Sequence, residues 1–279
     1  MSAKPVANIL ANLEKTIAKH EAAKVYQLPF WPDPHRGFPN EVIRSALFSA
    51  IQSRHRTYLE NEEICCQDGY KIIFTGQRLD QTHLDVFEGV MHVARGLHEG
   101  NNVRFSAHKL LKIIGRSTGR SDHQWLDRTF QQLTATSVKI MDKNGERVFW
   151  GSLLPSGAAD LTTGGYCVEL PRHLIKLFER GFTTVDFDRR KLLRGKPLAQ
   201  WLQLYYSSHA RPYPVTVEFL RNLSGSSATV KKFKQNLQDR LEELKTFGFI
   251  NDWKIENDLV NVDRTPTPAQ QRHLANRSS

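Results

Sequence analysis

The stretch that most restricts the fold lies near the C-terminal end of this chain of 279 residues. In "TVKKFKQNLQDRLEELKTFGF" apolar residues recur at steps of three and four, at Val230, Phe233, Leu237, Leu241 and Leu244. Such steps bring apolar side chains to one face, so they predict a single amphipathic helix that ends at Gly248. The following "FINDWKIENDLVNV" alternates around a turn at Glu256-Asn257-Asp258, which predicts a β-hairpin.

Two shorter helices are expected before this long one. "KPLAQWLQLYYSSHA" would bury Leu198, Trp201, Leu202 and Tyr205, and "VTVEFLRNLSG" would end at Gly225. The order is therefore helix, helix, long helix and hairpin. This order is typical of a winged helix, a helix-turn-helix followed by a β-hairpin wing.

The middle of the chain repeats the plan. Ser106 is expected to cap a helix, residues 115–119 form a turn of small residues, and Ser121 or Asp122 caps a second helix. The period then changes to two across residues 138–150 and again in "YCVEL". A second winged helix is predicted here, with the hairpin across residues 138–150 as its wing. Upstream, Thr82 is expected to cap a further helix that ends near Gly100.

These patterns predict an α+β protein of two tandem winged-helix domains with a flexible N-terminal arm. The arm, residues 1–38, would hold an amphipathic helix and a proline-rich peptide. The first winged-helix domain would span residues 39–185, the second residues 186–264, and residues 265–279 would be a disordered tail. Within "EVIRSALFSAIQ" the pattern leaves helix and strand equally open.

The charge of the chain points to a polyanionic partner. Lysine and arginine outnumber aspartate and glutamate by 39 to 29, which gives a formal charge of +10. No apolar run is long enough for a membrane span, and the N-terminus has no apolar signal core. The three cysteines, Cys65, Cys66 and Cys167, lack a disulfide framework spacing, which suits the cytoplasm.

The long helix of the second domain is the main candidate for DNA contact. Its apolar stripe leaves Lys231, Lys232 and Gln235 outward and Lys234 on the flank, while Ser227 and Thr229 lie at the N-terminal end. Recognition helices meet base edges mainly through their N-terminal turns. The alternative is a solvated face that happens to be basic.

The first domain carries a similar set. Arg120, Gln124, Arg128 and Gln131 face outward on its second helix, and Arg116 lies in the preceding turn, placed for a phosphate. A domain in this position could instead serve dimerisation. Between the domains, "DRRKLLRGK" includes Arg189 and Arg190, which either follow the backbone across a minor groove or form an ordinary solvated linker.

Motifs for catalysis and for cofactors are missing. The sequence contains no GxxxxGK[ST] phosphate loop, no CxxC pair, no HExxH and no His-x-His. Tyr205 and Tyr206, which could otherwise be nucleophiles of a DNA-nicking enzyme, fall on a helix predicted to be buried. We therefore expect no enzyme activity, no metal and no cofactor.

Several stretches resemble the TrfA family of plasmid replication initiators, namely "PNEVIRSALFSAI", "YLENEEI" and above all "FTGQRLDQTHLDVFEGVMHVAR". The resemblance implies binding to direct repeats (iterons) in a plasmid origin and melting of the adjacent AT-rich duplex, with single-stranded origin DNA as a further candidate partner. It also implies recruitment of the host replicative helicase and host initiator, and a monomer–dimer equilibrium in which the monomer binds DNA. A winged-helix transcriptional regulator is the alternative.

The same resemblance gives a role to the proline-rich stretch "QLPFWPDPHRGFPN". Family members carry a related peptide that docks on the bacterial sliding clamp, and Gln27, Leu28, Phe30 and Trp31 occupy its places here. An extended peptide held by prolines loses little entropy on binding. The alternative is that Phe30 and Trp31 pack on the protein's own first domain.

Overall fold

The structure is a computed structural model that describes residues 27–52, 56–67, 69–97, 102–142, 144, 148–160, 162–170 and 172–278. The helix expected within residues 5–24 lies outside the described residues. Among the described residues, no helix combines the length and the hydropathy that a membrane span requires.

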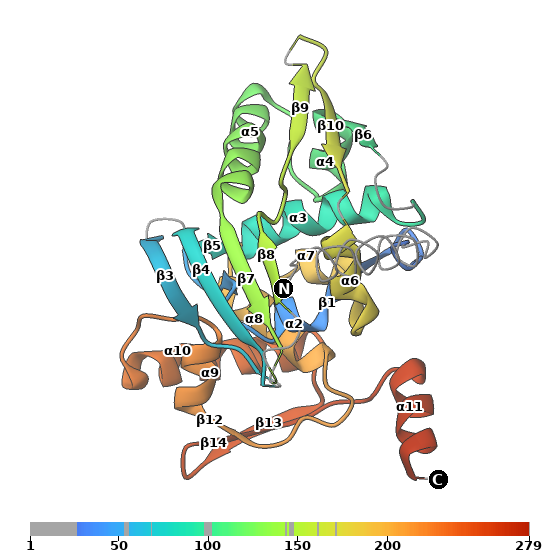
Figure 1. The fold of residues 1–279 in the computed structure, drawn as a ribbon. Coiled ribbons are helices and arrows are strands. Elements are labelled where there is room, and N and C mark those ends of the chain that lie inside the picture. The colour runs from blue at the N-terminus through green and yellow to red at the C-terminus, as the bar shows by residue number, and fades with distance from the viewer. Residues whose placement is uncertain are drawn as a thin grey trace, which may run out of the picture.

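The first half of the molecule, residues 27–186, is built from helices and small, mostly antiparallel sheets (Figure 1). Strand β1 pairs with β11, β2 pairs with β5 in parallel, and the other strands form the sheets β6-β10-β9 and β3-β4-β7-β8. The elements are β1 (His35–Pro39), α2 (Asn40–Ile43), β2 (Phe48–Ser49), β3 (Tyr58–Ile64), β4 (Lys71–Gln77), β5 (Leu79–Asp80), α3 (Gln81–Ala94), β6 (Asn102–Ser106), α4 (Ala107–Ile113), α5 (Arg120–Ala135), β7 (Ser137–Met141), β8 (Val148–Gly151), β9 (Gly157–Asp160), β10 (Gly165–Glu169), α6 (Arg172–Glu179) and β11 (Phe182–Asp186).

In the second half, residues 187–278, the helices α8, α9 and α10 share a hydrophobic cluster with a small sheet of order β12-β14-β13. This half begins with the short helix α7 and ends with α11, which projects at the lower edge in Figure 1. Its elements are α7 (Phe187–Lys191), α8 (Pro197–Ser207), β12 (Val215–Thr216), α9 (Val217–Leu223), α10 (Val230–Thr246), β13 (Asp252–Glu256), β14 (Leu259–Asp263) and α11 (Pro268–Ser278). The helices and the hairpin that the sequence predicts between residues 197 and 263 are therefore present, in the predicted order.

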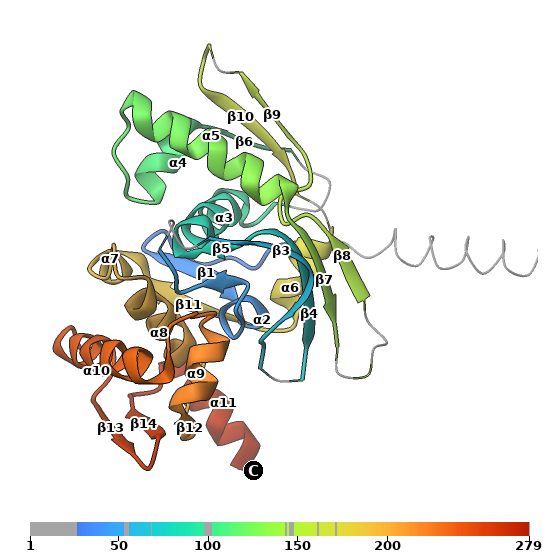
Figure 2. The ribbon, with the colours of Figure 1, turned by 90° about the vertical axis from the view of Figure 1, so that its left-hand side faces the viewer.

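Helix α3 lies at mid-height between the upper and lower parts of the molecule in Figures 1 and 2 and contacts α4, α5, β1 and α8. Its N-cap is Asp80 rather than Thr82, since the Asp80 carboxylate accepts the backbone N–H groups of Thr82 and His83. The helix also ends at Ala94, before the expected Gly100. Adjacent Asp and Thr both favour a cap position, so the local sequence alone did not separate them.

The buried apolar side chains form two clusters. One gathers the helices and sheets of the first half, from Leu28 to Val185, and also takes in Leu204 of α8. The other spans Leu193 to Val262 and is built mainly on the helical stripe of α10. The side chains of Leu237, Leu241 and Leu244 have no exposed area, which explains why this helix was the clearest signal in the sequence.

Arg190 joins the two halves. Its guanidinium is buried and donates to the Asp85 carboxylate and the Gln81 side-chain carbonyl of α3, at 3.0 and 3.1 Å. It also donates to the Gln200 carbonyl of α8, at 3.0 Å. Burial raises the pKa of Asp85, and the Arg190 cation opposes that rise. The prediction that Arg190 contacts DNA is therefore wrong, because its side chain is buried and its guanidinium is hydrogen-bonded to protein groups.

The hairpin that the sequence predicts as the wing of the first half belongs to a different sheet. A hairpin does form across residues 137–151, but β7 pairs with β4 and extends the sheet β3-β4-β7-β8. The sheet β6-β10-β9 instead packs on α4 and α5: β6 contacts α4, and Phe130 of α5 stacks on Phe105 of β6 and Tyr166 of β10. Alternation showed that Val138 and Ile140 share a buried face, but periodicity does not identify the partner strand.

Two segments that the sequence predicts to be flexible or disordered, residues 27–38 and 268–278, are part of the folded structure. Leu28 and Trp31 are 1% exposed, and β1 pairs with β11 along its whole length, so residues 27–38 belong to the body and not to a flexible arm. At the other end, residues 268–278 form α11 instead of a disordered tail. Gln270 ties this helix to the body by donating to the Ser207 carbonyl at 2.8 Å. The region 41–52, left open between helix and strand, contains the short α2 and β2.

We predict that Arg190→Ala lowers the free energy of unfolding by about 3–5 kcal/mol, because it leaves the buried Asp85 carboxylate without its cation. Denaturant titration followed by circular dichroism measures the change. The matched control is Lys245→Ala, which removes an exposed ion pair with Asp252 and should cost less than about 1 kcal/mol. Equal losses in the two variants would contradict the role given to Arg190.

Candidate nucleic-acid interface

Helix α10 presents a polar ridge because its apolar side is fully used by the core. Thr229 is the N-cap, and its hydroxyl accepts the backbone N–H of Lys232 at 3.4 Å. The helix stops at Phe247, and Gly248 follows with φ of 67°, the left-handed conformation that favours glycine. The predicted residues Ser227, Thr229, Lys231, Lys232 and Gln235 are all exposed around its N-terminal turns.

The cations on this ridge differ in their partners. Lys234 reaches sideways to Asp258 in the turn of the hairpin β13–β14, with Nζ and Oδ1 2.6 Å apart. Within the described part of the chain, Lys231 and Lys232 form no ion pair. Two unpaired cations in the first turn of a helix oppose the helix dipole. An anion placed beside them would relieve that repulsion.

Arg189 is exposed but already engaged. Its Nη2 donates to the backbone carbonyls of Phe247 and Gly248, at 3.0 and 2.7 Å, and its guanidinium lies 4.7 Å from the Phe249 ring centroid. It therefore caps the C-terminal end of α10 from the short helix α7. The basic stretch between the halves thus helps to fix the position of α10. Its adjacent arginines, Arg189 and Arg190, both donate hydrogen bonds to groups of the protein.

Helix α5 exposes the other predicted set. Arg120, Gln124, Arg128 and Gln131 are exposed, and the Gln131 amide donates to the Asp127 carboxylate on the preceding turn at 3.0 Å. Arg116 is held more firmly than predicted, since it pairs with Asp122 at 2.9 Å and stacks 3.7 Å from the Trp125 ring centroid. Hydrogen bonds from Ser117 and Arg116 lower the pKa of Asp122 despite partial burial.

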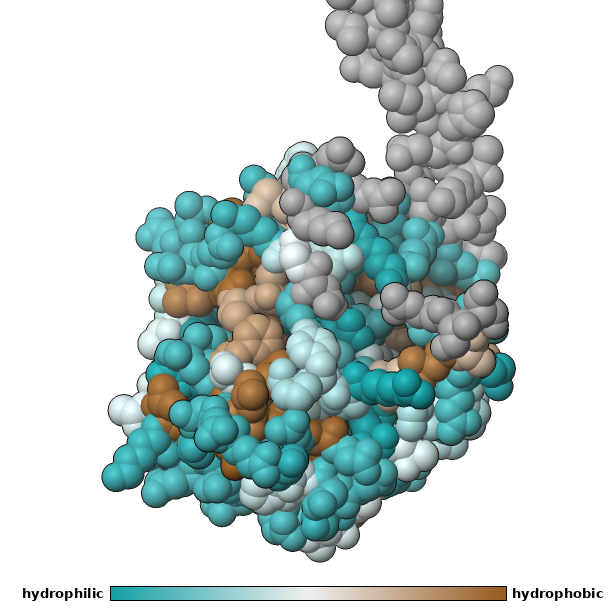
Figure 3. Space-filling view, turned by 90° about the horizontal axis from the view of Figure 1, so that it is seen from below, coloured by the Kyte–Doolittle hydropathy of each residue, from teal (hydrophilic) through white to brown (hydrophobic). Residues whose placement is uncertain are grey.

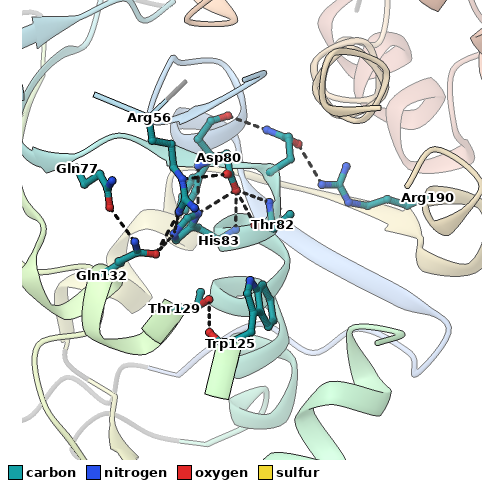
Figure 4. A network of polar contacts seen from close by, with 11 residues as sticks. Arg56, Gln77, Asp80, Thr82, His83, Trp125, Thr129, Gln132 and Arg190 are labelled. Atoms are coloured by element: carbon teal, nitrogen blue, oxygen red, sulfur yellow. Dashed lines mark hydrogen bonds and ion pairs between the residues drawn. The ribbon is translucent and has the colours of Figure 1, made fainter. Parts of the chain in front are cut away.

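A buried polar network holds α5 against the start of α3 (Figure 4). His83 Nε2 lies 2.7 Å from the Gln132 side-chain oxygen of α5, and Arg56 contacts both of these residues. Burial disfavours the charged form of Asp80, but hydrogen bonds from His83 and Thr82 and the Arg56 cation outweigh it and lower its pKa to about 2. The network fixes the orientation of α5, and so which of its faces is exposed.

The predicted clamp-binding peptide is folded against the first half. Gln27 donates to the Gly96 carbonyl at 2.6 Å, and the Trp31 indole N–H donates to His92 Nδ1 at 3.0 Å. Trp31 also stacks on Phe178, with ring centroids 5.6 Å apart. Burial and then the nearby Arg36 and Arg95 lower the pKa of His92 to about 3, so His92 is a neutral acceptor at pH 7. Of the large side chains in the peptide, Phe30 remains exposed, at 73%.

The exposed residues of α5 and α10 were predicted from the sequence. The residues that hold these helices in place were not. Arg78 is one example, because it donates to Ser49 at 2.9 Å and to the carbonyl of Gly225 in the turn before α10. Its partners lie 29 and 147 residues away, so no local pattern could have marked it. Among the described residues, no group of acidic, histidine and cysteine side chains could hold a metal ion.

Comparison with known proteins gives consistent matches. The model of the family described as "TrfA protein" matches residues 2–264. The curated "Plasmid replication initiator protein TrfA" of Escherichia coli is 27% identical over 254 residues, which cover 88% of this chain and 66% of that relative, a little under two thirds of its length.

Solved structures of RctB share the fold. Domains 2 and 3 of RctB, solved as selenomethionine derivatives, match with a TM-score of 0.56 at 12% identity, covering 82% of this chain and 98% of that one. A second structure of the same two domains gives a TM-score of 0.52 at 12% identity, with 83% and 99% covered. At this identity the likeness concerns the fold alone.

We predict that the Asp80 network stabilises the protein at neutral pH and that this contribution disappears in acid. The folded pKa of about 2 lies below the ordinary 3.8, so the folded state binds fewer protons than the unfolded chain between these values. The advantage, roughly 2 kcal/mol, is complete above about pH 4 and is lost as the pH falls toward 2. Asp80→Asn, which keeps the cap, should therefore show a flatter stability curve in this range. The exposed Asp239→Asn is the control, and identical slopes for wild type and Asp80→Asn would refute the assignment.

Proposed function

This chain belongs to the TrfA protein family, and on that premise we propose that it initiates plasmid replication by binding direct repeats (iterons) of duplex DNA in the plasmid origin. The curated relative is a plasmid replication initiator protein, which supports a role in replication initiation. The net charge of +10 supports a polyanionic target.

One observation carries the proposal, the arrangement of charge on α10. Lys231 and Lys232 are exposed, lie in the first turn of a helix and form no ion pair among the described residues. In the free protein this arrangement costs a few tenths of a kcal/mol against the helix dipole. Backbone phosphates on either side of the helix would turn the same arrangement into attraction.

We propose that the second half acts as a winged helix. Helices α9 and α10 form the helix-turn-helix, with α10 in the major groove and the hairpin β13–β14 as the wing on the adjacent backbone. The ion pair between Lys234 and Asp258 links the hairpin turn to the start of α10, so the two would approach DNA together. Gln235, on the outer ridge, suits an adenine edge. Seen from below, where the second half faces the viewer, the surface is mostly hydrophilic with smaller apolar areas, which fits such a role (Figure 3).

The first half would act as the other winged helix, with α4 and α5 as the helix-turn-helix and β9–β10 as the wing. Arg120, Gln124, Arg128 and Gln131 would contact the duplex from α5. Helices α5 and α10 both lie toward the left in Figures 1 and 2, α5 in the upper part of the molecule and α10 in the lower part above the hairpin β13–β14, which supports contacts with adjacent turns of one duplex. Because Arg190 joins the halves, the two helices would act at a fixed spacing.

Origin opening would follow from binding energy alone, without catalysis or a cofactor. Several copies, each bound as a monomer to one of the direct repeats, would distort the DNA and strain the neighbouring AT-rich duplex until it melts. Dimerisation would hold the protein in a form that does not bind the repeats. The assembled copies would recruit the host replicative helicase and the host initiator.

Sliding-clamp docking through Gln27 to Trp31 would require a conformational change. Leu28 and Trp31 would have to leave the core, and burying such side chains contributes about 1.5–3 kcal/mol each. We therefore propose that the folded chain presents Phe30 and the exposed Gln27 to the clamp, but not Leu28 and Trp31, until this segment is released. Phe30 already lies beside a cation, with its ring centroid 5.5 Å from the Arg95 guanidinium.

We predict that Gln235→Ala lowers the preference for origin repeats over unrelated duplex by about 5- to 150-fold, since one good base contact contributes about 1–3 kcal/mol of discrimination. Affinity for unrelated DNA should stay within about twofold of wild type, because Gln235 carries no charge. Fluorescence anisotropy titration with both duplexes measures the ratio. If the ratio is unchanged in Gln235→Ala but falls in Lys245→Ala at the far end of α10, the proposed orientation of the helix is wrong.

The clamp proposal is tested by retention of the whole chain on immobilised bacterial sliding clamp. Phe30→Ala alters an exposed side chain and should leave the fold intact, so a change in retention reports the contact itself. We expect retention of the variant to fall severalfold below wild type. Equal retention of the two proteins would remove this peptide as the clamp contact.

A further inference from the structure

A cavity of about 500 Å³ lies where the two halves meet, along one side of α10. Its walls are residues 50–52 of the first half, residues 195–198 at the start of α8, residues 226–228 before α10, and Lys232, Asn236 and Arg240 of α10 itself. We call it the seam cavity. Because it is lined by both halves, it exists only while they are docked.

The walls of the seam cavity are fixed by hydrogen bonds. The Ala50 backbone N–H donates to the Ser224 carbonyl at 2.7 Å, and Arg78 binds both Ser49 and the Gly225 carbonyl. Gly225 has φ of 68°, and a Cβ atom there would come within 2.5 Å of the Ser49 hydroxyl oxygen. The turn that leads into α10 therefore packs directly on the first half, and the cavity has a defined shape.

The chemistry of the seam cavity suits an anion. Three cations line it, Lys196, Lys232 and Arg240, whereas a single carboxylate, Glu243, pairs with Lys196 and with Arg240, in the latter case at 3.0 Å. Three positive charges against one negative leave an excess of two.

Further groups reinforce this excess. Arg240 Nε is buried without a hydrogen-bond partner in the described residues, and the N-terminal end of α8, which attracts anions, forms part of the wall. Asn236 adds an exposed amide that can donate. The lining thus offers several donors and a net positive charge to one small anionic group.

The position of the cavity relative to α10 suggests which anion it takes. Lys232, Asn236 and Arg240 are four residues apart and share one flank of the helix, while Lys234, paired with Asp258 of the hairpin, lies on the other. Figures 1 and 2 agree, since both show the hairpin below α10 and the first half above it. A helix in the major groove has one phosphate backbone on each side. The hairpin meets one backbone, so the cavity faces the other.

We propose that the seam cavity binds a backbone phosphate of duplex DNA, on the strand opposite to the one that the hairpin contacts. The proposal rests on the proposed function, in that α10 must lie in the major groove. Since the phosphate touches both halves, this contact makes DNA affinity depend on their docking. It also assigns contacts to Asn236, Lys196 and Arg240, which lie off the outer ridge of α10.

The test uses Asn236→Asp, which changes one exposed amide to a carboxylate of the same shape at the mouth of the cavity. The control is Gln271→Glu on α11, which adds the same charge on an exposed residue of a helix that does not line the cavity. Affinity of the whole chain for duplex DNA is measured across a range of salt concentrations. We expect Asn236→Asp to weaken binding about tenfold or more and to reduce the salt slope by about one, while Gln271→Glu stays near wild type.

Phosphate ethylation interference locates the contact. In wild type, ethylation of one phosphate beside each α10 site should block binding, and in Asn236→Asp that single effect should vanish while the others remain. Lys232→Ala should give the same pattern. If both variants keep the wild-type salt slope and interference pattern, the proposal is overturned. A variant that binds nucleotides such as ATP more weakly, with DNA affinity unchanged, overturns it as well.

The proposed function and the phosphate contact in the seam cavity can be refuted independently of each other. A wild type that binds origin repeats no better than unrelated duplex removes the proposed function. The seam cavity is still tested in that case, because backbone contacts are independent of sequence and the same titration on unrelated duplex reports them.

Discussion

The buried guanidinium of Arg190 is the interaction on which the arrangement of the molecule depends. It bonds to α3 of the first half and to α8 of the second. The position of the second half is therefore fixed relative to α3. Two further carboxyl groups lie at this helix: Asp80, its N-cap, pairs with Arg56, and Glu88 Oε2 lies 3.4 Å from Arg36 Nε of β1. Buried ion pairs add little net stability compared with apolar packing, but breaking one is costly. They therefore specify which elements meet, and here they specify the positions of α5 and α10.

This arrangement connects the fold to DNA binding in a simple way. Arg189, next to Arg190, caps the C-terminal end of α10, and Arg78 holds the turn before its N-terminal end. Both ends of the helix are thus tied to other elements by arginines, while its outer ridge is left to solvent. In the proposed role of α10 as a DNA-recognition helix, a helix held at both ends would lose little entropy on binding, so more of the electrostatic attraction would be retained as affinity.

The sequence predicted the elements that depend on local spacing. The stripe from Val230 to Leu244 identified α10, and the turn residues Asn257 and Asp258 between two alternating segments identified the hairpin. In the structure these two residues have φ of 48° and 61°. The sequence did not predict contacts between residues that are distant along the chain. Arg190 lies in a run of charges that resembles a solvated linker, and its partner Asp85 is 105 residues away. Trp31 sits among prolines typical of an exposed peptide, and its partner His92 is 61 residues away. Contacts of this kind are set by tertiary packing, which periodicity does not report.

The central claim is that two helices, held at a fixed spacing by one polypeptide, contact adjacent turns of the same duplex. Hydroxyl-radical footprinting of the purified chain on a single repeat of its plasmid origin tests it most directly. We predict protection on one face of the DNA in two patches, about 10 base pairs apart. Protection of only one patch, or none on the origin repeats, would contradict it.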